Sequence, residues 1–386
     1  MPGMPPSPAH RSRTILPIIA ALACGLALAI PAVASGGWMD AFKDPEDGKF
    51  DLTRYLLDRK GALPVPILIT EPAVGLGGGG ALMFFQQSLA ERARSAQGRY
   101  RPPNVYGVAG FGTENGTWGT GGGGMMSLAD DRWRVRGGGG YIDANLDFFG
   151  IGAASGSTPF AYSLAGYSIS STALYRLKRT DGWFAMNFRY LDLESQFETG
   201  PVGAVLDGTR TSSGIGPSFE FDSRDNLFTA SRGFLAAVDA MFYGEAIGSD
   251  VSFQTYRART FAYVPAGPVV FGTRVDGRSA SQGTPFYMMP YLQIRGIPAV
   301  RYQGRTTALI EEEVRWNVDP RWALTGFYGI GRAWGEQLDF EDADAHGAGG
   351  GGFRYLLARE MGIYSGVDFA WGPEFAFYLV VGNAWR

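Results

Sequence analysis

The feature that most limits what this chain can fold into is a repeated alternation of apolar and polar residues along most of its length. From Pro64 onward, windows of about 10 to 18 residues alternate with period two, and turn residues separate them. Side chains of a strand point to opposite faces in turn, so each window predicts a strand with one apolar face. Fifteen such windows are present: 72–87, 104–113, 117–129, 132–142, 160–178, 182–198, 211–223, 232–244, 251–264, 268–280, 306–317, 321–332, 348–358, 362–371 and 374–385.

Charged residues keep to one face of these windows. In 182–198, Phe184 and Phe188 share one face, whereas Arg189 lies on the other. Charges on a single face are the pattern of a membrane barrel with hydrocarbon outside and water inside. Glu312, which stands between two further glutamates, is the exception, and we expect it near the membrane interface or beside a local irregularity.

The lengths of windows and connections also favour a membrane barrel. Most windows reach the roughly 9 to 11 residues that a tilted strand needs to cross a bilayer. Counting back from the C-terminus, the connections fall on the inner and outer sides in turn, which places 281–305 outside. Fifteen strands cannot return both termini to the periplasm, so a sixteenth is needed, in Pro64–Thr70 or within 143–159. We therefore predict an all-β protein, a transmembrane antiparallel β-barrel of sixteen strands over 64–386.

The N-terminal residues predict export. Two arginines precede an apolar run over 15–30, and a small-x-small triplet follows at 32–34. We predict a signal peptide over 1–34, whose removal takes away the only cysteine, Cys24. A chain without cysteine has no disulfide framework. Residues 35–63 would then form a short periplasmic segment, in which Asp51 caps a short helix.

Charge and histidine content exclude several functions. The chain has 34 basic and 37 acidic residues, and loss of the two arginines of 1–34 leaves 32 minus 37, a net charge of −5. That balance excludes nucleic-acid binding driven by bulk charge. After the leader, His346 is the only histidine, and no nucleophile motif lies near it. We expect no catalytic residue, and we interpret Asp342, Asp344 and His346 as a solvated turn in preference to a metal site.

Runs of glycine resemble phosphate loops at first sight. Gly75, Gly77 and Gly80 satisfy the GxGxxG pattern. A dinucleotide site needs a helix after that pattern, whereas another strand-like stretch follows here. Glycines that let barrel strands bend are the better interpretation, and we expect no cofactor.

The connection over 281–305 carries an arginine and a glycine, Arg295 and Gly296, in the middle of a run rich in glycine and proline. A loop of this length between barrel strands must either cover the barrel mouth or fold into the lumen. A loop that folds inward needs a charged anchor, and Arg295 could supply it.

Several motifs occur in an order that resembles the BamA/TamA superfamily of outer-membrane barrels, also called bacterial surface antigens. Ile294-Arg-Gly-Ile297 is similar to the family's Val-Arg-Gly-aromatic motif at the tip of the sixth outer loop, and Glu313-Val-Arg315 to its Glu-aromatic-Arg element. Phe327 to Gly331 is similar to its Phe-x-Asp-x-Gly element. The resemblance also covers a periplasmic turn motif with Asp222, Arg224, Asp225 and Asn226, and a C-terminal strand signal with Phe375, Phe377 and Trp385.

The resemblance implies a sixth outer loop that folds into the lumen, where the family's loop arginine faces a strand glutamate and an aspartate. Here the aspartate position is Gly329, so the resemblance leaves Glu313 as the retained partner of Arg295. We therefore expect Arg295, Gly296 and Glu313 to form a loop anchor in the lumen. A second departure is that the family's periplasmic recruitment domains are missing, which puts full insertase activity in doubt.

The implied function is translocation of protein or lipid, or outer-membrane biogenesis, in the outer membrane of a Gram-negative bacterium. The implied partners are outer-membrane lipids and lipopolysaccharide, with unfolded outer-membrane proteins or a lipid as cargo, around a monomeric barrel. The alternative is a passive pore or structural surface barrel without insertase activity, and an enzymatic barrel is third.

Overall fold

The computed structural model describes residues 42–57, 61–86, 104–178, 180–198, 206–382 and 385. The predicted signal peptide lies outside these residues, as does most of the segment between the second and third strands. Within the described residues, the structure is almost entirely β-sheet, with one short helix, α2 (Thr53–Leu57). None of the helices described is long and apolar enough to cross a membrane.

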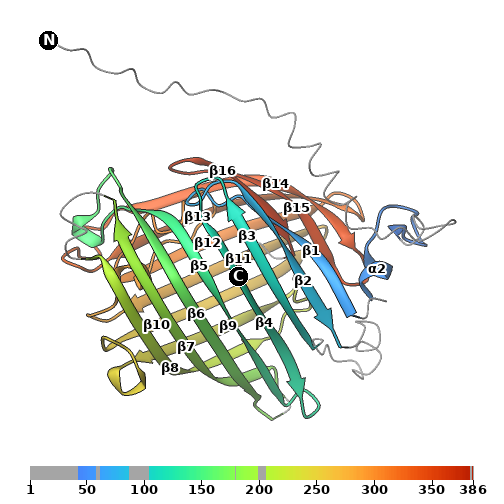
Figure 1. Cartoon of the computed structure of the whole chain (residues 1–386). Coiled ribbons are helices and arrows are strands. Elements are labelled where there is room, and N and C mark those ends of the chain that lie inside the picture. Colours follow the sequence, from blue (N-terminus) through green and yellow to red (C-terminus); the bar gives the residue numbers. More distant parts are fainter. Residues whose placement is uncertain are drawn as a thin grey trace, which may run out of the picture. The chain divides into compact units, whose positions relative to one another are not determined.

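Sixteen strands follow one another in an antiparallel sheet in which each is paired with its neighbours in sequence (Figure 1). The sheet curls into a nearly closed barrel, so the predicted fold class and strand number are confirmed. The strands are β1 (Gly61–Ile69), β2 (Gly77–Phe85), β3 (Val105–Thr113), β4 (Trp118–Leu128), β5 (Trp133–Phe148), β6 (Phe160–Arg176), β7 (Gly182–Phe197), β8 (Gly208–Asp222), β9 (Gly233–Tyr243), β10 (Phe253–Ala266), β11 (Val269–Ala280), β12 (Thr306–Asn317), β13 (Trp322–Trp334), β14 (Ala345–Ala358), β15 (Ile363–Trp371) and β16 (Phe375–Val381).

The sixteenth strand is β1, which settles the choice that the window count left open. It begins at Gly61, three residues before the predicted start of the barrel. The alternative within 143–159 is wrong, because residues to Phe148 extend β5 and the short 3-10 helix η2 (Gly152–Ala154) follows.

Burial along the strands follows the predicted two-residue period. In β12, Leu309, Glu311 and Arg315 are buried inside the barrel, whereas Ile310 and Trp316 are exposed on its outer face. Large apolar side chains cover the outer face of other strands in the same way, as lipid contact requires. The ladder is continuous at Glu312, so the local irregularity expected there is absent. Its carboxylate instead accepts a hydrogen bond from the Thr273 hydroxyl at 2.8 Å.

The glycine runs lie within strands, as predicted. Gly121 to Gly124 in β4 pair with Gly137 to Gly140 in β5, residue against residue. A Cβ at Gly121 would approach the carbonyl oxygen of Gly139 to 2.7 Å, so these backbones lie closer than larger residues allow. The phosphate-loop interpretation is therefore excluded by geometry, since Gly77 and Gly80 also lie within β2.

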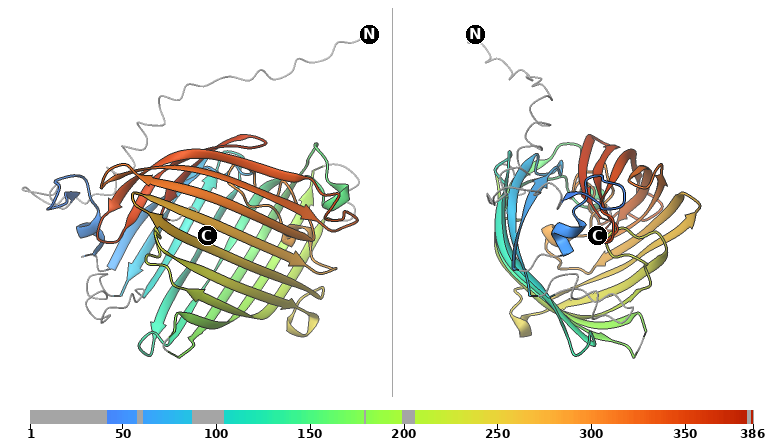
Figure 2. Two further views of the ribbon diagram at one scale, coloured as in Figure 1. Left: turned by 180° about the vertical axis from the view of Figure 1, so that it is seen from behind. Right: turned by 90° about the vertical axis from the view of Figure 1, so that its right-hand side faces the viewer.

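Two ends of the barrel can be distinguished. The end that carries the long connection over 281–305 is called the outer end, and the end that carries the turns 318–321 and 359–362 is called the inner end. Helix α2 lies at the inner end (Figure 1), and the view along the barrel shows it in front of the inner mouth (Figure 2). In the C-terminal half, successive connections fall at the outer and the inner end in turn, as predicted.

Candidate functional site

The long outer connection over 281–305 folds into the barrel. After η4 (Phe286–Met288), its residues Leu292, Ile294 and Ile297 are at most 3% exposed. They pack on Leu309 and Ala348, which lie on the inward faces of β12 and β14. Since apolar side chains of the loop meet apolar side chains of the inner wall, removal of apolar surface from water holds the loop in the lumen.

Arg295 occupies the centre of a buried charge cluster. Its Nε donates to Glu311 Oε1 at 2.7 Å, and its Nη1 donates to Asp368 Oδ2 at 2.8 Å. The same Nη1 lies 2.8 Å from Glu313 Oε2, an ion pair whose angle falls outside hydrogen-bond geometry. The guanidinium also lies 3.7 Å from the centre of the Phe327 ring, within range of a cation–π interaction. We call Arg295, Glu311, Glu313 and Asp368 the lumenal cluster.

The structure thus brings Arg295 and Glu313 together. The hydrogen bonds of Arg295, however, go to Glu311 and Asp368, which the sequence did not indicate as its partners. Glu311 and Asp368 are both completely buried, whereas the Glu313 side chain is 16% exposed. The expectation of a single retained partner is therefore corrected to three. A signal for Asp368 was present, because it is the only charged residue of the window 362–371. Its partner lies 73 positions away in the chain, so only the fold could identify it.

Gly329 explains how the cluster differs from the family pattern. It lies opposite Glu311 in the ladder, and a Cβ there would approach Ile294 Cγ2 to 2.7 Å. The space that an aspartate would need is therefore filled by the loop. Asp368 on β15 supplies the negative charge from another direction.

A second layer of arginines satisfies the same carboxylates. Arg274 Nη1 lies 3.3 Å from Glu311 Oε2 and donates to the carbonyl oxygen of Gln293 in the loop at 2.9 Å. Arg354 Nη1 lies 2.7 Å from Asp368 Oδ1. Each buried carboxylate that binds Arg295 by hydrogen bonds therefore faces two guanidinium groups. Removal of one partner from such an arrangement leaves an uncompensated buried charge, which costs several kcal/mol.

Gly296 has the left-handed backbone conformation that favours glycine, with φ of +94°. A Cβ at this position would lie 3.0 Å from the Ala348 Cβ and 3.2 Å from the Ala370 Cβ. Its N–H donates to the Tyr378 hydroxyl on β16 at 3.0 Å. The glycine of the motif is thus required by backbone conformation and by close packing on the inner wall.

The loop tip contacts both edges of the sheet. Gly296 binds Tyr378 on β16, and the N–H of Ala299 donates to Glu71 Oε1, just beyond the end of β1, at 3.0 Å. Within the described residues, no ladder joins β1 to β16. We call this interruption the seam, and the loop tip bridges it from inside.

The edge of β1 that faces the seam is poorly suited to ladder pairing. Pro64 and Pro66 lie within β1 and have no N–H to donate. Because β1 pairs continuously with β2, its prolines are compatible with that ladder only if their nitrogens face the opposite edge. The free edge of β1 therefore lacks two donors in alternate positions, a feature by which natural proteins limit pairing at sheet edges.

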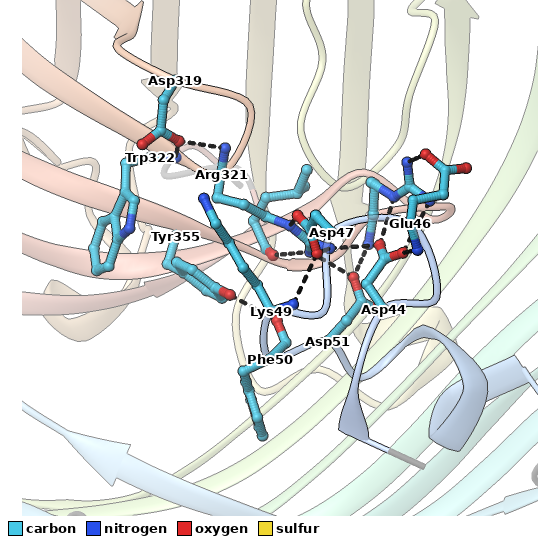
Figure 3. Close-up of polar contacts among 12 residues, drawn as sticks. Asp44, Glu46, Asp47, Lys49, Phe50, Asp51, Asp319, Arg321, Trp322 and Tyr355 are labelled. Carbon is cyan, nitrogen blue, oxygen red and sulfur yellow. Dashed lines mark hydrogen bonds and ion pairs between the residues drawn. The ribbon is translucent and has the colours of Figure 1, made fainter. Parts of the chain in front are cut away.

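At the inner end, a second arginine cluster attaches the N-terminal segment to the barrel (Figure 3). Arg321, in the turn between β12 and β13, is completely buried. Its Nε donates to Asp47 Oδ2 and its Nη1 to Asp51 Oδ2, each at 2.6 Å, and its Nη2 binds Asp44. Arg359, in the turn between β14 and β15, also binds Asp44, with Nε to Oδ2 at 2.6 Å. We call these five residues the N-terminal clasp.

Asp51 caps α2, as predicted, by accepting the N–H of Thr53 at 2.6 Å through Oδ1. Its other oxygen binds Arg321 and the N–H of Arg359, a role that the sequence did not indicate. Burial opposes ionisation of Asp51, but hydrogen bonds from Thr53 and Arg321 hold the pKa of its carboxyl below the usual value. The hydrogen bond from Arg321 lowers the pKa of Asp47 to about 2.

The predicted periplasmic turn motif lies between β8 and β9 and forms its own network. Arg224 binds both oxygens of Asp222, and Asp225 Oδ1 accepts the N–H groups of Ser231 and Arg232. Asn226 Nδ2 donates to the carbonyl oxygen of Met361 at 2.9 Å, which joins this turn to the turn between β14 and β15. These contacts give the motif a structural role at the inner end.

The last strand is shorter than the predicted window 374–385. Phe375 and Phe377 lie on the outer face of β16, as expected, but the strand ends at Val381. Gly382 follows with φ of +77°, which redirects the chain. Trp385 is buried against Phe261 and Tyr263 on the inner wall of β10, rather than on the lipid face.

His346, which the sequence placed beside Asp342 and Asp344, lies at the start of strand β14, next to the loop over 281–305. The His346 ring stacks on Tyr302 with 3.6 Å between ring centres. Among the described residues, no group of three or more histidine, cysteine, aspartate or glutamate side chains is placed to hold a metal ion.

A nearly closed sixteen-stranded barrel is also the fold that the comparisons with solved structures find. BamA from Haemophilus ducreyi lacking POTRA domains 1–3 matches with a TM-score of 0.58 and 12% identity, over 84% of this chain and 70% of that chain. CdiB from Acinetobacter baumannii matches with a TM-score of 0.53 and 10% identity, over 83% of this chain and 59% of that chain. CdiB from Escherichia coli matches with a TM-score of 0.54 and 9% identity, over 82% of this chain and 61% of that chain.

The chain therefore has the fold of the BamA and CdiB barrels, which confirms the resemblance at the level of the fold. It spans about three fifths of the length of the two CdiB chains. No protein-family model and no curated protein sequence matches it.

Proposed function

We propose that this protein resides in the outer membrane of a Gram-negative bacterium and moves protein or lipid across or into that membrane. The observation that carries the proposal is the loop over 281–305, which the buried lumenal cluster holds inside the barrel. Ordering a loop costs about 1 to 2 kcal/mol per residue, and burying charges adds to that cost. A passive pore conducts best through an open lumen, whereas this loop is buried across the lumen despite the free-energy cost of ordering it.

The seam gives the proposal a physical route. An edge strand with unpaired backbone groups, here β16, can accept another strand by β-augmentation, and a lipid chain can pass where no ladder closes the wall. Because no ladder joins β1 to β16 among the described residues, and Pro64 and Pro66 offer no N–H donors, opening the seam breaks fewer backbone hydrogen bonds than opening a paired strand junction. The partners under this proposal are outer-membrane lipids, lipopolysaccharide, and an unfolded outer-membrane protein or lipid as cargo, with the barrel acting as a monomer.

Conductance in planar bilayers separates this proposal from the passive pore. We expect the purified protein to conduct little and Arg295→Ala to show frequent or steady openings, because the loop loses its anchor. Arg189→Ala, on the inward face of β7, is the matched control and should behave as the parent. A steady open pore in the parent protein would favour the passive pore instead.

Deletion of the gene tests the biological role. We expect changed outer-membrane protein or lipid profiles, restored by the parent protein and not by Arg295→Ala. An unchanged profile would count against a role in biogenesis. The proposal assigns no catalysis, so His346→Gln should leave restoration intact.

A further inference from the structure

The outer end of the barrel contains a partly open cavity that none of the contacts above requires. Three outer connections interlock there: 149–159, 281–305 and 335–344. The N–H of Gly152 donates to the Gln303 carbonyl at 3.1 Å, and the N–H of Ala153 donates to the Glu336 carbonyl at 3.3 Å. Gln303 Nε2 donates in turn to the carbonyl oxygen of Phe286 at 3.0 Å. The connections therefore form one connected rim.

A cavity of about 520 Å³ lies between this rim and the strand β8. That volume falls in the range of small-molecule sites, roughly 300 to 1,000 Å³. Its wall is mainly aromatic and aliphatic, and the rings of Phe148 and Phe286 meet edge to face with 5.2 Å between centres. Phe160, Leu206 and Met289 complete the apolar lining.

One cation, Arg210, lines this mainly apolar cavity. The Arg210 guanidinium, at the outer end of β8, makes no hydrogen bond or ion pair with the residues that the structure describes. The carboxylate of the wall, Glu336, is already paired with Arg305. The cavity therefore offers apolar surface and one unused positive charge.

The backbone of the cavity wall includes a tight turn, in which the N–H of Gly335 donates to the Leu338 carbonyl at 2.8 Å. Glu336 and Gln337 are consecutive non-glycine residues with left-handed φ values of 52° and 66°. Gly152 packs so closely on this turn that a Cβ would come within 2.2 Å of the Gly335 carbonyl oxygen. Close packing of backbone on backbone therefore fixes this side of the cavity wall.

We propose that this cavity binds a medium-chain carboxylic acid, with the chain against Phe148 and Phe286 and the carboxylate on Arg210. An arginine binds a carboxylate through two parallel hydrogen bonds, which an alcohol of the same length cannot accept equally well. Each methylene that enters the apolar part contributes about fourfold in affinity. Because Phe286 belongs to the same loop as Arg295, the bound acid would contact the segment that occupies the lumen.

Equilibrium dialysis of radiolabelled decanoate against the full-length protein in saturated phosphatidylcholine nanodiscs tests the proposal. Partition into lipid is the same for all variants, so the saturable component isolates the site. We expect saturable binding, a weaker affinity for decanol by about tenfold or more, and affinity that rises from octanoate to decanoate. Non-saturable uptake alone, or equal affinity for decanol, would overturn the proposal.

Two pairs of variants locate the site. Arg210→Gln should weaken decanoate binding by about tenfold or more, and Arg189→Gln should not. Ala154→Trp fills the cavity and should abolish binding, whereas Ala153→Trp, on the same short helix but outside the lining, should retain it. Heat-modifiable gel mobility reports whether each variant is folded. Binding that survives both Arg210→Gln and Ala154→Trp in folded protein would place decanoate elsewhere and refute the site.

Discussion

At the scale of single residues, Gly329 shows how a missing functional group can be replaced from another part of the fold. The family pattern has an aspartate at this position, but here Ile294 of the loop fills the space beside it. Asp368 provides the carboxylate from β15, with Oδ2 bound to Arg295, and its second oxygen, Oδ1, lies 2.7 Å from Arg354 Nη1. The negative charge that binds Arg295 therefore comes from β12 and β15 together.

Gly329→Asp should therefore weaken the loop anchor although it restores the family residue. The new side chain would collide with Ile294 and bring another negative charge beside Glu311, and overpacking of this kind costs about 1 to 3 kcal/mol. Limited proteolysis within 281–305 measures loop release, and we expect faster cleavage. Adding Ile294→Ala should partly restore protection against proteolysis, because the smaller side chain leaves room for the aspartate. Cleavage as slow as in the parent protein would show that the site accommodates an aspartate.

Arg321→Met tests the N-terminal clasp. The substitution leaves Asp44 and Asp51 buried without their main cation, and loss of one partner from a buried cluster costs about 3 kcal/mol or more. We expect amide hydrogens of 42–57 to exchange faster, while those of the barrel strands keep their protection. Arg54→Met, on the exposed side of α2, is the matched control and should leave exchange unchanged. Equal exchange in both variants would mean that the clasp does not hold the segment.

At the scale of elements, the N-terminal segment is attached to the barrel mainly through carboxylates, so its docking depends on pH. Asp47 has a pKa lowered to about 2, and that of Asp51 is lowered as well. A lowered pKa means that the carboxylate stabilises the docked state above the ordinary aspartate pKa of about 4. This contribution is lost as the pH falls from about 4 towards 2.

Hydrogen exchange of 42–57 as a function of pH, corrected for the intrinsic exchange rate, measures this dependence. We expect protection to be constant from pH 7 to 5 and to decline below about pH 4. In Asp47→Asn, we expect the protection of 42–57 to decline less steeply below about pH 4. Protection that is unchanged down to pH 2 would contradict the assignment of docking to these carboxylates.

The edge of β1 carries a prediction about the seam. Pro64→Ala and Pro66→Ala together restore two N–H donors, each worth about 0.5 to 1.5 kcal/mol if it finds an acceptor on β16. We expect a higher temperature for the heat-modifiable mobility shift and weaker restoration of the deletion phenotype. Pro265→Ala in β10 changes a proline away from the seam and serves as the control. An unchanged transition temperature would indicate that β16 offers no matching acceptors.

At the scale of the whole molecule, the lumenal cluster and the N-terminal clasp act on the same wall of the barrel. Arg295 contacts β12 and β15 in the lumen, and Arg321 and Arg359 hold the segment that precedes β1 to the inner turns of β12 to β15. The loop tip adds contacts to β16 and to Glu71, just beyond the end of β1. Both edges of the seam are thus tied to one group of strands, β12 to β16.

The sequence by itself determined the barrel and its strand number, because lipid outside and water inside impose a two-residue period that is visible locally. It also predicted that Arg295 and Glu313 would meet, through a resemblance that the fold bears out. It did not identify Glu311 and Asp368 as hydrogen-bond partners, the five residues of the clasp, or the inward turn of Trp385. Each of these depends on which distant strands lie side by side. An ion pair between residues far apart in the chain does not change the local alternation of apolar and polar residues. Only the closed barrel brings those groups within hydrogen-bond distance.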